Sequence, residues 1–306
     1  MPDLTLLEAA KHSQDDIERA VAKIIVEESA VLEYLPMRTI NGPAYRYHRE
    51  QSLGTVAFRG VGGTYTADSG VINPLFEPLV IMGGEVSIDN FEVEVMQNLL
   101  NLKADKYRMK ARQVGIKFSE TFFEGDTVVD PFAFDGLRKR LTGGQKLEMA
   151  TNGAVLSLAK LDELLDTVVG DGGEKVLFMS AAVRRQVTAL ARAQTGSSLI
   201  SMTQDTFGKQ HVAYSGSPIR VVRRGDDGST ILGFDETQGS SNLAASIYCV
   251  RFGSDYVMGI QSKSLPSVKD FGEIQSAPKH LGRIEWFPGL VVRHPRCAAR
   301  LAGVLA

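Results

Sequence analysis

The segment from Asp89 to Asp126 constrains the fold of this 306-residue chain more than any other part. It contains no proline, and Gly115 is its one interior glycine. Asp89 is a suitable N-cap, and Gly125 is of the residue type that ends helices in the left-handed conformation. If only residues 99–123 are helical, the helix is already ~37 Å long. A helix of that length spans a whole domain, so the remaining elements must lie along it.

The second half of this segment has an apolar face. Ala111, Val114, Phe118 and Phe122 recur at helical spacing, and we expect Val114, Phe118 and Phe122 to lie in the core. The lysines fall mostly on the other side: Lys103, Lys106, Lys110 and Lys117. The simplest interpretation is one long core helix of an α+β enzyme, and the rest of the sequence has to be weighed against it.

Residues 1–36 are predicted to begin as extended chain and to continue as a helix. Ser13 followed by Asp16 resembles a capping box, and Pro36 ends the segment. The helix has an apolar stripe of Ile17, Ala20, Val21, Ile24 and Ile25. A helix of about four turns is marginal alone in water, so this stripe must pack on the same chain or on a neighbour.

Residues 41–88 have a different pattern. Runs at 45–49 and 55–59 alternate as strands do, and an extended run at 75–82 contains Pro78, which suits an edge or a bulge. The glycine-rich residues 60–74 between them are long for a loop inside a compact domain. The simplest arrangement is a two-stranded arm that projects from the body. Because an isolated hairpin is barely stable in water, such an arm predicts a partner surface.

Residues 136–262 are predicted to form a separate α/β lobe. A short basic helix capped by Asp135 comes first, and helices beginning at Ser157 and Ser180 flank a buried strand at 175–179. Further strands are predicted at 211–214, 219–223, 230–234, 246–252 and 256–261. The tail, residues 264–306, alternates short strands with turns. We expect it to return and pair beside the long helix.

The composition argues against several classes of function. A net charge of −2, from 34 basic and 36 acidic residues, lacks the basic excess of a dedicated nucleic-acid-binding protein. Cys249 and Cys297 lie far apart and favour neither a zinc site nor a disulfide framework, so we expect a reducing compartment. There is no signal peptide and no apolar run of the ~18 residues that a membrane span needs. We expect a soluble intracellular protein without a membrane partner.

No catalytic, cofactor-binding or metal-binding pattern emerges. Gly60–Gly63 lacks GxGxxG spacing, and Gly143–Lys146 lacks the Walker pattern. The five histidines are scattered without metal-ligand spacing, and basic runs such as Arg138–Arg140 are more typical of solvated faces. We therefore expect no enzyme activity, no cofactor and no bound metal.

Several segments, taken in order, point to one family. LTLLEAAKHSQDD followed by a helix is similar to a short N-arm, and residues 47–59 with the glycine-rich stretch look like an extended loop. GGEVSID leads into the long helix, which closes on FFEGD and is followed by FDGL, and VLFMS precedes a helix with Arg184 and Arg185. This order resembles the major capsid protein of tailed double-stranded DNA bacteriophages, which has the Hong Kong 97-type (Johnson) fold. The resemblance covers essentially the whole chain, and no single motif is decisive.

The resemblance implies an α+β fold in four parts. These are an N-arm (1–40), an extended loop (41–88), a peripheral domain with the long spine helix (89–135 and 263–306) and an α/β axial domain (136–262). The spine-helix core would be Val114, Phe118 and Phe122. Contacts between subunits would come from the N-arm and the extended loop: Ile17, Val21, Ile24, Phe58, Arg59, Gly62, Gly63 and Tyr65.

The same resemblance implies a structural subunit that assembles with copies of itself into hexamers and pentamers of an icosahedral phage head. The head would be assembled in the host bacterial cytoplasm and would enclose double-stranded DNA, contacted without base recognition. Scaffolding, portal and decoration proteins are the further partners that it implies. An encapsulin-type compartment of the same fold is the nearest alternative, and a soluble α+β enzyme is an alternative of a different class.

The chain departs from part of this family in one respect. Some members cross-link the shell by an isopeptide bond between a lysine of the extended loop and an asparagine of a neighbour. Residues 41–88 contain no lysine. We therefore predict no such cross-link, and stability that depends on non-covalent arm exchange or on a decoration protein.

Overall fold

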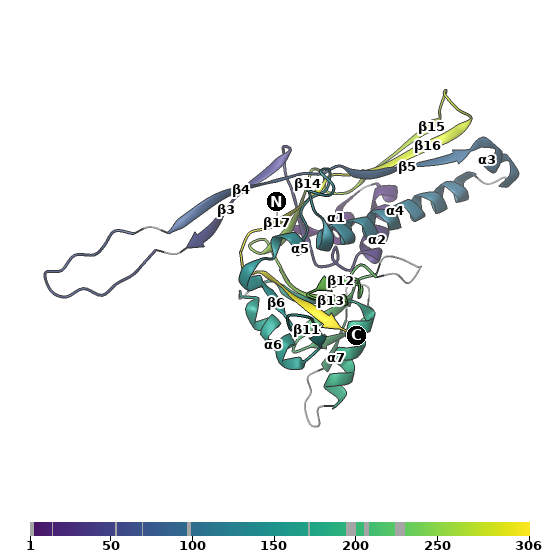
Figure 1. The fold of residues 1–306 in the computed structure, drawn as a ribbon. Helices are drawn as coiled ribbons and strands as arrows, with labels where there is room; N and C mark the ends of the chain where they lie inside the picture. Colours follow the sequence, from purple (N-terminus) through teal and green to yellow (C-terminus); the bar gives the residue numbers. More distant parts are fainter. Residues whose placement is uncertain are drawn as a thin grey trace.

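The computed structural model describes residues 3–13, 15–52, 54–68, 70–96, 99–170, 172–193, 200–204, 208–223 and 230–306. A body built around a wide sheet carries two projections that point in opposite directions (Figure 1). One is the hairpin of β3 (Ala44–Ser52) and β4 (Val71–Pro78). The other is a three-stranded sheet covered by α3 (Asn90–Met96) and α4 (Leu99–Glu124).

The long helix α4 packs through the face that its sequence predicts. Ala111, Val114, Phe118 and Phe122 are all buried. The Phe118 ring lies 5.0 Å from the Trp286 ring and 5.8 Å from that of Phe134, measured between centroids. A Cβ added at Gly115 would lie 2.6 Å from the carbonyl oxygen of Ile25, which explains the interior glycine: the N-terminal helix crosses α4 there. Asp89, the expected N-cap of the long helix, lies instead before the separate helix α3, where it accepts a hydrogen bond from the Phe91 N–H at 2.9 Å.

Gly125 ends this helix for a reason that the sequence analysis did not give. Its φ is not positive, so the expected left-handed conformation is wrong. A Cβ at Gly125 would lie 2.3 Å from the carbonyl oxygen of Phe134, and the Gly136 N–H donates to the Gly125 carbonyl at 2.8 Å. The chain doubles back and packs backbone on backbone, and only glycine leaves room for that approach.

The N-terminal segment forms two helices rather than one. Strand β1 (Leu4–Thr5) leads into α1 (Leu6–His12), where Thr5 and Glu8 make a complete capping box that the sequence analysis missed. Helix α2 (Asp16–Glu28) is capped by Asp15, not by Ser13. It ends well before Pro36, which instead begins β2 (Pro36–Thr39). The hydroxyls of Ser29 and Ser119 lie 2.8 Å apart where α2 meets α4.

The wide sheet has the strand order β1-β2-β14-β13-β8-β11-β10-β9. The strands not yet located are β8 (Glu174–Met179), β9 (Ile200–Gln204), β10 (Gln210–Tyr214), β11 (Ser217–Val221), β13 (Ser241–Phe252) and β14 (Val257–Gln261). Four shorter additions and one long strand extend it: β6 (Lys146–Glu148), β7 (Ala154–Val155), β12 (Glu236–Gln238), β17 (Pro288–Val292) and β18 (Ala298–Leu305). Residues 230–234, predicted as a strand, form a turn. Their apolar side chains, Ile231 and Leu232, are buried without strand pairing.

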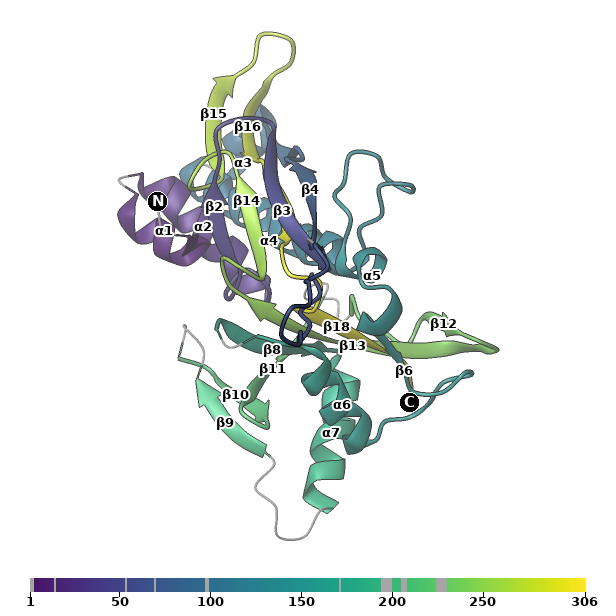
Figure 2. The same ribbon diagram turned by 90° about the vertical axis from the view of Figure 1, so that its left-hand side faces the viewer.

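The wide sheet separates two cores. Val176 and Phe178 of β8 face the core that contains α4, where the Phe178 and Phe123 rings lie 5.4 Å apart. Leu177 and Met179 face a second core with α6 (Leu158–Thr167) and α7 (Ala181–Ala193), which lie below the sheet (Figure 2). The strand is apolar on both faces because both faces are covered.

The tail divides between two sheets. Strands β15 (Ser267–Glu273) and β16 (Lys279–Trp286) pair with β5 (Met82–Asp89) beside α4, as expected for the tail. In contrast, β17 pairs with β14, and β18 pairs with β13 in the wide sheet, so the expectation that the tail lies beside the long helix is wrong for these strands. Strand β18 is apolar and almost wholly buried, which requires an interior position. The division into four domains remains a prediction.

Candidate functional site

The β3–β4 arm packs on the body near its base, where Tyr47 is buried, and its outer part is exposed. Its two strands pair only with each other, in antiparallel register from Ala44 opposite Pro78 to Ser52 opposite Val71. In Figure 1 it extends far from the body and ends in a long loop. Strand β4 exposes most of its side chains, Ile72 and Phe76 among them. Because a two-stranded sheet is marginally stable in water, this arm favours a second surface that covers it.

The tip of the arm, residues 54–68, has an internal structure of its own. The Thr55 amide and hydroxyl both donate to the Asp68 carboxylate, at 3.0 and 2.9 Å. The Arg59 guanidinium lies 5.2 Å from the centroid of the Tyr65 ring and donates to the Gly63 carbonyl at 3.2 Å. The tip therefore has a defined shape, although residues 55–59 do not form the predicted strand: no strand of the described chain lies opposite them.

This shaped tip leaves apolar side chains in water. Val56, Phe58 and Val61 are fully exposed. Gly62, at φ +84°, adopts a conformation that other residues rarely take, and it turns the chain between Val61 and Gly63. Five of the residues predicted to contact a neighbour therefore lie together here: Phe58, Arg59, Gly62, Gly63 and Tyr65. Apolar side chains gathered at an exposed tip are typical of interaction sites, so the contact predicted for these residues stays a prediction that the exposure favours.

The three predicted contact residues of the N-terminal segment have different surroundings. Val21 is buried and Ile24 is partly buried, both against the core that contains α4. Ile17 is 62% exposed. The structure thus places Val21 and Ile24 against the chain's own core, and the contact of Ile17 with a neighbour stays a prediction.

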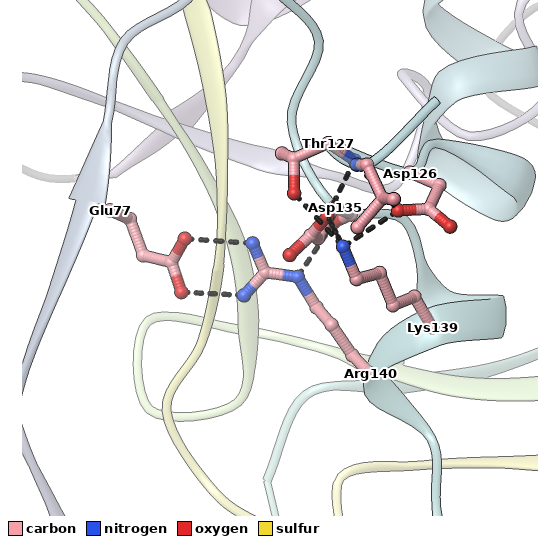
Figure 3. A network of polar contacts seen from close by, with 7 residues as sticks. Glu77, Asp126, Thr127, Asp135, Lys139 and Arg140 are labelled. Carbon is pink, nitrogen blue, oxygen red and sulfur yellow. Dashed lines mark hydrogen bonds and ion pairs between the residues drawn. The ribbon is translucent and has the colours of Figure 1, made fainter. Parts of the chain in front are cut away.

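An ion pair fixes the base of the arm to the body (Figure 3). The Arg140 guanidinium binds both oxygens of Glu77 in β4, at 2.5 and 2.7 Å, and its Nε donates to the Asp135 carbonyl at 2.6 Å. The Tyr47 hydroxyl of β3 donates to the Val292 carbonyl at 3.2 Å. Two-point pairing of this kind fixes orientation as well as distance.

Burial strengthens this anchor. The Arg140 and Glu77 side chains are only 17% and 14% exposed. Burial alone would lower the pKa of Arg140, but the hydrogen bonds and charge of Glu77 outweigh it and raise that pKa. Burial, and then the negative charge of Glu77, raise the pKa of Tyr47 to about 12. Arg140 therefore stays charged and Tyr47 stays neutral over the physiological pH range.

The residue before Arg140 holds a different element. Lys139 Nζ donates to Asp126 Oδ1 at 2.7 Å, to Asp135 Oδ1 at 2.8 Å and to Thr127 Oγ1 at 2.9 Å. These groups belong to the loop between α4 and α5 (Leu137–Arg140). The hydrogen bond from Lys139 is the main cause that lowers the pKa of Asp126. In Figure 3 the Arg140 guanidinium faces Glu77 of the arm, and Lys139 Nζ lies among Asp126, Thr127 and Asp135 of the loop.

This anchor was not predicted, because a basic run such as Arg138–Arg140 is more typical of a solvated face. Asp135 was expected to cap α5, but Gly136 occupies that position and the Asp135 carboxylate binds Thr127 and Lys139. Glu77 was the residue from which a buried ion pair could have been predicted. An acidic side chain between Phe76 and Pro78 interrupts an otherwise apolar run, and a buried acid needs a cation.

Groups that could bind a metal or act as nucleophiles were sought among the described residues. None of their His, Cys, Asp and Glu side chains form a group of three or more that could hold a metal ion. Cys249 and Cys297 are free and buried, and burial raises the pKa of each thiol to about 12, so neither is a reactive thiolate. In this part of the chain, no helix is long and apolar enough to cross a membrane.

The arrangement of arm, long helix and wide sheet recurs in solved structures. A chain of the holo-SrpI encapsulin complex from Synechococcus elongatus PCC 7942 matches with a TM-score of 0.64 and 14% identity, over 88% of this chain and 85% of that chain. A chain from Microbacterium phage Oxtober96 matches with a TM-score of 0.62 and 12% identity, over 91% of both chains. The capsid chain of an empty GTA particle gives 0.57 and 13%, over 91% and 90%. The chain has the Hong Kong 97-type fold.

This result confirms the predicted fold class, α+β of the Hong Kong 97 type. At 12–14% identity the likeness concerns the fold. No protein-family model matches the sequence, and no curated protein matches it either. The spine helix of this fold is α4, and its extended loop is the β3–β4 arm.

Proposed function

We propose that this chain is a structural subunit that assembles with copies of itself into a closed icosahedral shell, as in a phage head. The arm is the observation that carries the proposal. It is fixed at its base by Arg140 and Glu77, it is shaped at its tip by Arg59 and Tyr65, and it leaves the apolar side chains of that tip fully exposed. Burying the apolar tip against another copy removes that surface from water and stabilises the assembly.

Such a contact joins the arm of one copy to a different surface of the next copy. Contacts of this kind close into rings when the rotation between copies allows it. This supports hexamers and pentamers as the closed rings of the shell. The likeness in fold to chains of phage and GTA particles supports a head in the virion, assembled in the host bacterial cytoplasm around double-stranded DNA. Scaffolding, portal and decoration proteins would be its further partners, and the role is structural rather than enzymatic.

The second candidate is a protein compartment of the encapsulin type. The full-length likeness to an encapsulin chain, with a TM-score of 0.64, favours it. The two candidates differ in what the shell encloses. Nuclease-resistant double-stranded DNA in particles from the native source supports the phage head, whereas an enclosed protein without DNA supports the compartment.

Negative-stain microscopy and sedimentation velocity of the purified protein test the proposal. We expect closed particles, free rings or tubes, all of which sediment faster than a monomer. A single monomeric or dimeric species at every concentration and salt level would contradict it. The matched pair is Phe58→Ser at the tip and Leu243→Ser, a side chain 68% exposed on β13. Only the tip variant should lose assembly, and both should melt like the unmodified protein.

A further inference from the structure

A cleft of about 520 Å³ lies at the base of the arm, where β3 and β4 meet the body. Its polar lining includes Arg49 from β3, Arg296 from the turn before β18, and the paired Arg140 and Glu77. Unlike Arg140, neither Arg49 nor Arg296 makes an ion pair with any carboxylate that the structure describes. The cleft therefore has two guanidinium groups more than it has acids to pair with them.

The same cleft has an apolar part. Leu75, Leu141, Val292 and Pro295 contribute to its lining. A free inorganic anion would satisfy the guanidinium groups but would leave this apolar surface in water. A segment that carries both a carboxylate and a large apolar side chain satisfies both, because guanidinium groups bind carboxylates strongly in concave, partly desolvated sites.

The loop between α4 and α5 has this composition. The loop Asp126–Asp135 between α4 and α5 leaves Val128, Val129 and Phe132 exposed at 81%, 84% and 85%. Between them, Asp130 makes no ion pair with any described side chain; its carboxylate accepts only the Phe132 N–H, at 3.1 Å. The loop thus places one unpaired acid among three solvated apolar side chains.

The loop is held in one shape. Asp126 Oδ1 accepts the Val128 N–H at 2.8 Å, and the Asp126 carbonyl accepts the N–H groups of Val129 and Asp130 at 3.0 and 2.9 Å. The Thr127 N–H donates to Asp135 at 2.9 Å, and Lys139 joins both ends. A loop that is already ordered loses little conformational entropy on docking.

We propose that the loop Asp126–Asp135 of one copy docks in the arm-base cleft of the next copy, with Asp130 paired to Arg49 and Arg296 and Phe132 against the apolar lining. This inference rests on the proposed function, since it requires copies that assemble. Loop and cleft are different patches that both adjoin α5, so the contact is heterologous. The patches are neighbours on one chain, so the axis that relates the copies passes close to α5. This contact is separate from the one made by the arm tip.

Exchange of the charges tests the pairing. The variants are Asp130→Arg, Arg296→Asp and the two combined, with Asp166→Arg on the exposed face of α6 as the control. Asp130→Asn is added because its amide oxygen can still accept the Phe132 N–H while the charge is lost. The measurement is the lowest protein concentration at which particles form, by light scattering and sedimentation, together with the melting temperature of each unassembled variant.

We expect Asp130→Arg and Arg296→Asp each to raise this concentration at least tenfold, and the combined variant to return to within threefold of the unmodified protein. Asp130→Asn should raise it less than Asp130→Arg, and Asp166→Arg should leave it unchanged. Normal assembly of both single variants would overturn the inference while leaving the proposed shell intact. Failure of the combined variant to recover, or an equal loss in the control, would overturn it as well. If the unmodified protein itself forms no particles, this result contradicts the proposed function, and with it the docking contact.

Discussion

Removal of the Arg140 side chain tests whether the arm is fixed before any copy binds. Arg140→Ala removes two hydrogen bonds to Glu77 and one to the Asp135 carbonyl, and it leaves the Glu77 carboxylate with little water around it. Breaking a fully buried pair costs about 3–5 kcal/mol; because both partners here keep some exposure, we expect Arg140→Ala to lower the free energy of unfolding by about 2–3 kcal/mol.

The assay is urea denaturation of the unassembled protein, with Glu77→Ala and the double variant completing a thermodynamic cycle. The double variant removes both charges, so no unpaired carboxylate remains. We expect it to be more stable than the sum of the single losses predicts, with a coupling free energy of about 1.5–2 kcal/mol. The control is Lys146→Ala, whose pair with Glu148 is 38% and 42% exposed. That pair should contribute less than about 0.5 kcal/mol.

Two results would refute this reasoning. If Arg140→Ala unfolds within about 0.5 kcal/mol of the unmodified protein, the pair is screened like an ordinary surface pair and does not fix the arm. If the single losses simply add, Arg140 and Glu77 act independently. In either case the orientation of the arm would be set by the strands themselves, and assembly would have to select it from a mobile population.

Further outcomes are expected. Phe118→Ala should cost about 3–5 kcal/mol because its ring is fully buried among Trp286 and Phe134, whereas Phe132→Ala should leave the melting temperature of the free chain unchanged; equal shifts would mean that the core assignment is wrong. Particles boiled in denaturing detergent should give one band at 33.3 kDa, and a ladder of covalent oligomers would contradict the predicted absence of a cross-link. The pKa of Tyr47 is raised to about 12 in the folded chain, so its contribution to stability is complete below pH 10, the ordinary tyrosine value, and is lost as the pH rises toward 12. Between pH 10 and 12 the urea midpoint of Tyr47→Phe should therefore fall less than that of the unmodified protein. Equal falls would show that ionisation of Tyr47 does not contribute to this loss of stability.

The long helix and the arm were predictable because each depends on local sequence. The helical period holds over several turns, at Ala111, Val114, Phe118 and Phe122. A glycine-rich stretch between two extended runs predicts a two-stranded arm. The sheet to which β18 belongs was not predictable in this way. Its run AARLAGVL is compatible with any buried strand position, and only the pairing with β13 decides which sheet it joins.

The anchor at the base of the arm was missed for a similar reason. Glu77 and Arg140 lie 63 residues apart in the sequence. Nothing in the local sequence around either residue shows which distant charge it will pair with. Basic runs such as Arg138–Arg140 are usually solvated, so the general rule pointed away from the specific case. Burial converts two ordinary charges into an anchor, and burial is a property of the fold.

Helix α5 also limits where this chain can change in length. Consecutive residues of a helix point about 100° apart, and with this spacing Lys139 binds Asp126 of the loop while the Arg140 guanidinium reaches Glu77 of the arm. A single inserted or deleted residue in α5 would turn one of these side chains away from its partner, so even the smallest change in length should be rejected there. The tip at residues 54–68 is closed on itself by Thr55 and Asp68, and residues added between them need not disturb the base. Related chains that differ in size should therefore differ at the tip and agree in the length of α5, and a peptide grafted into this protein is best placed between Thr55 and Asp68.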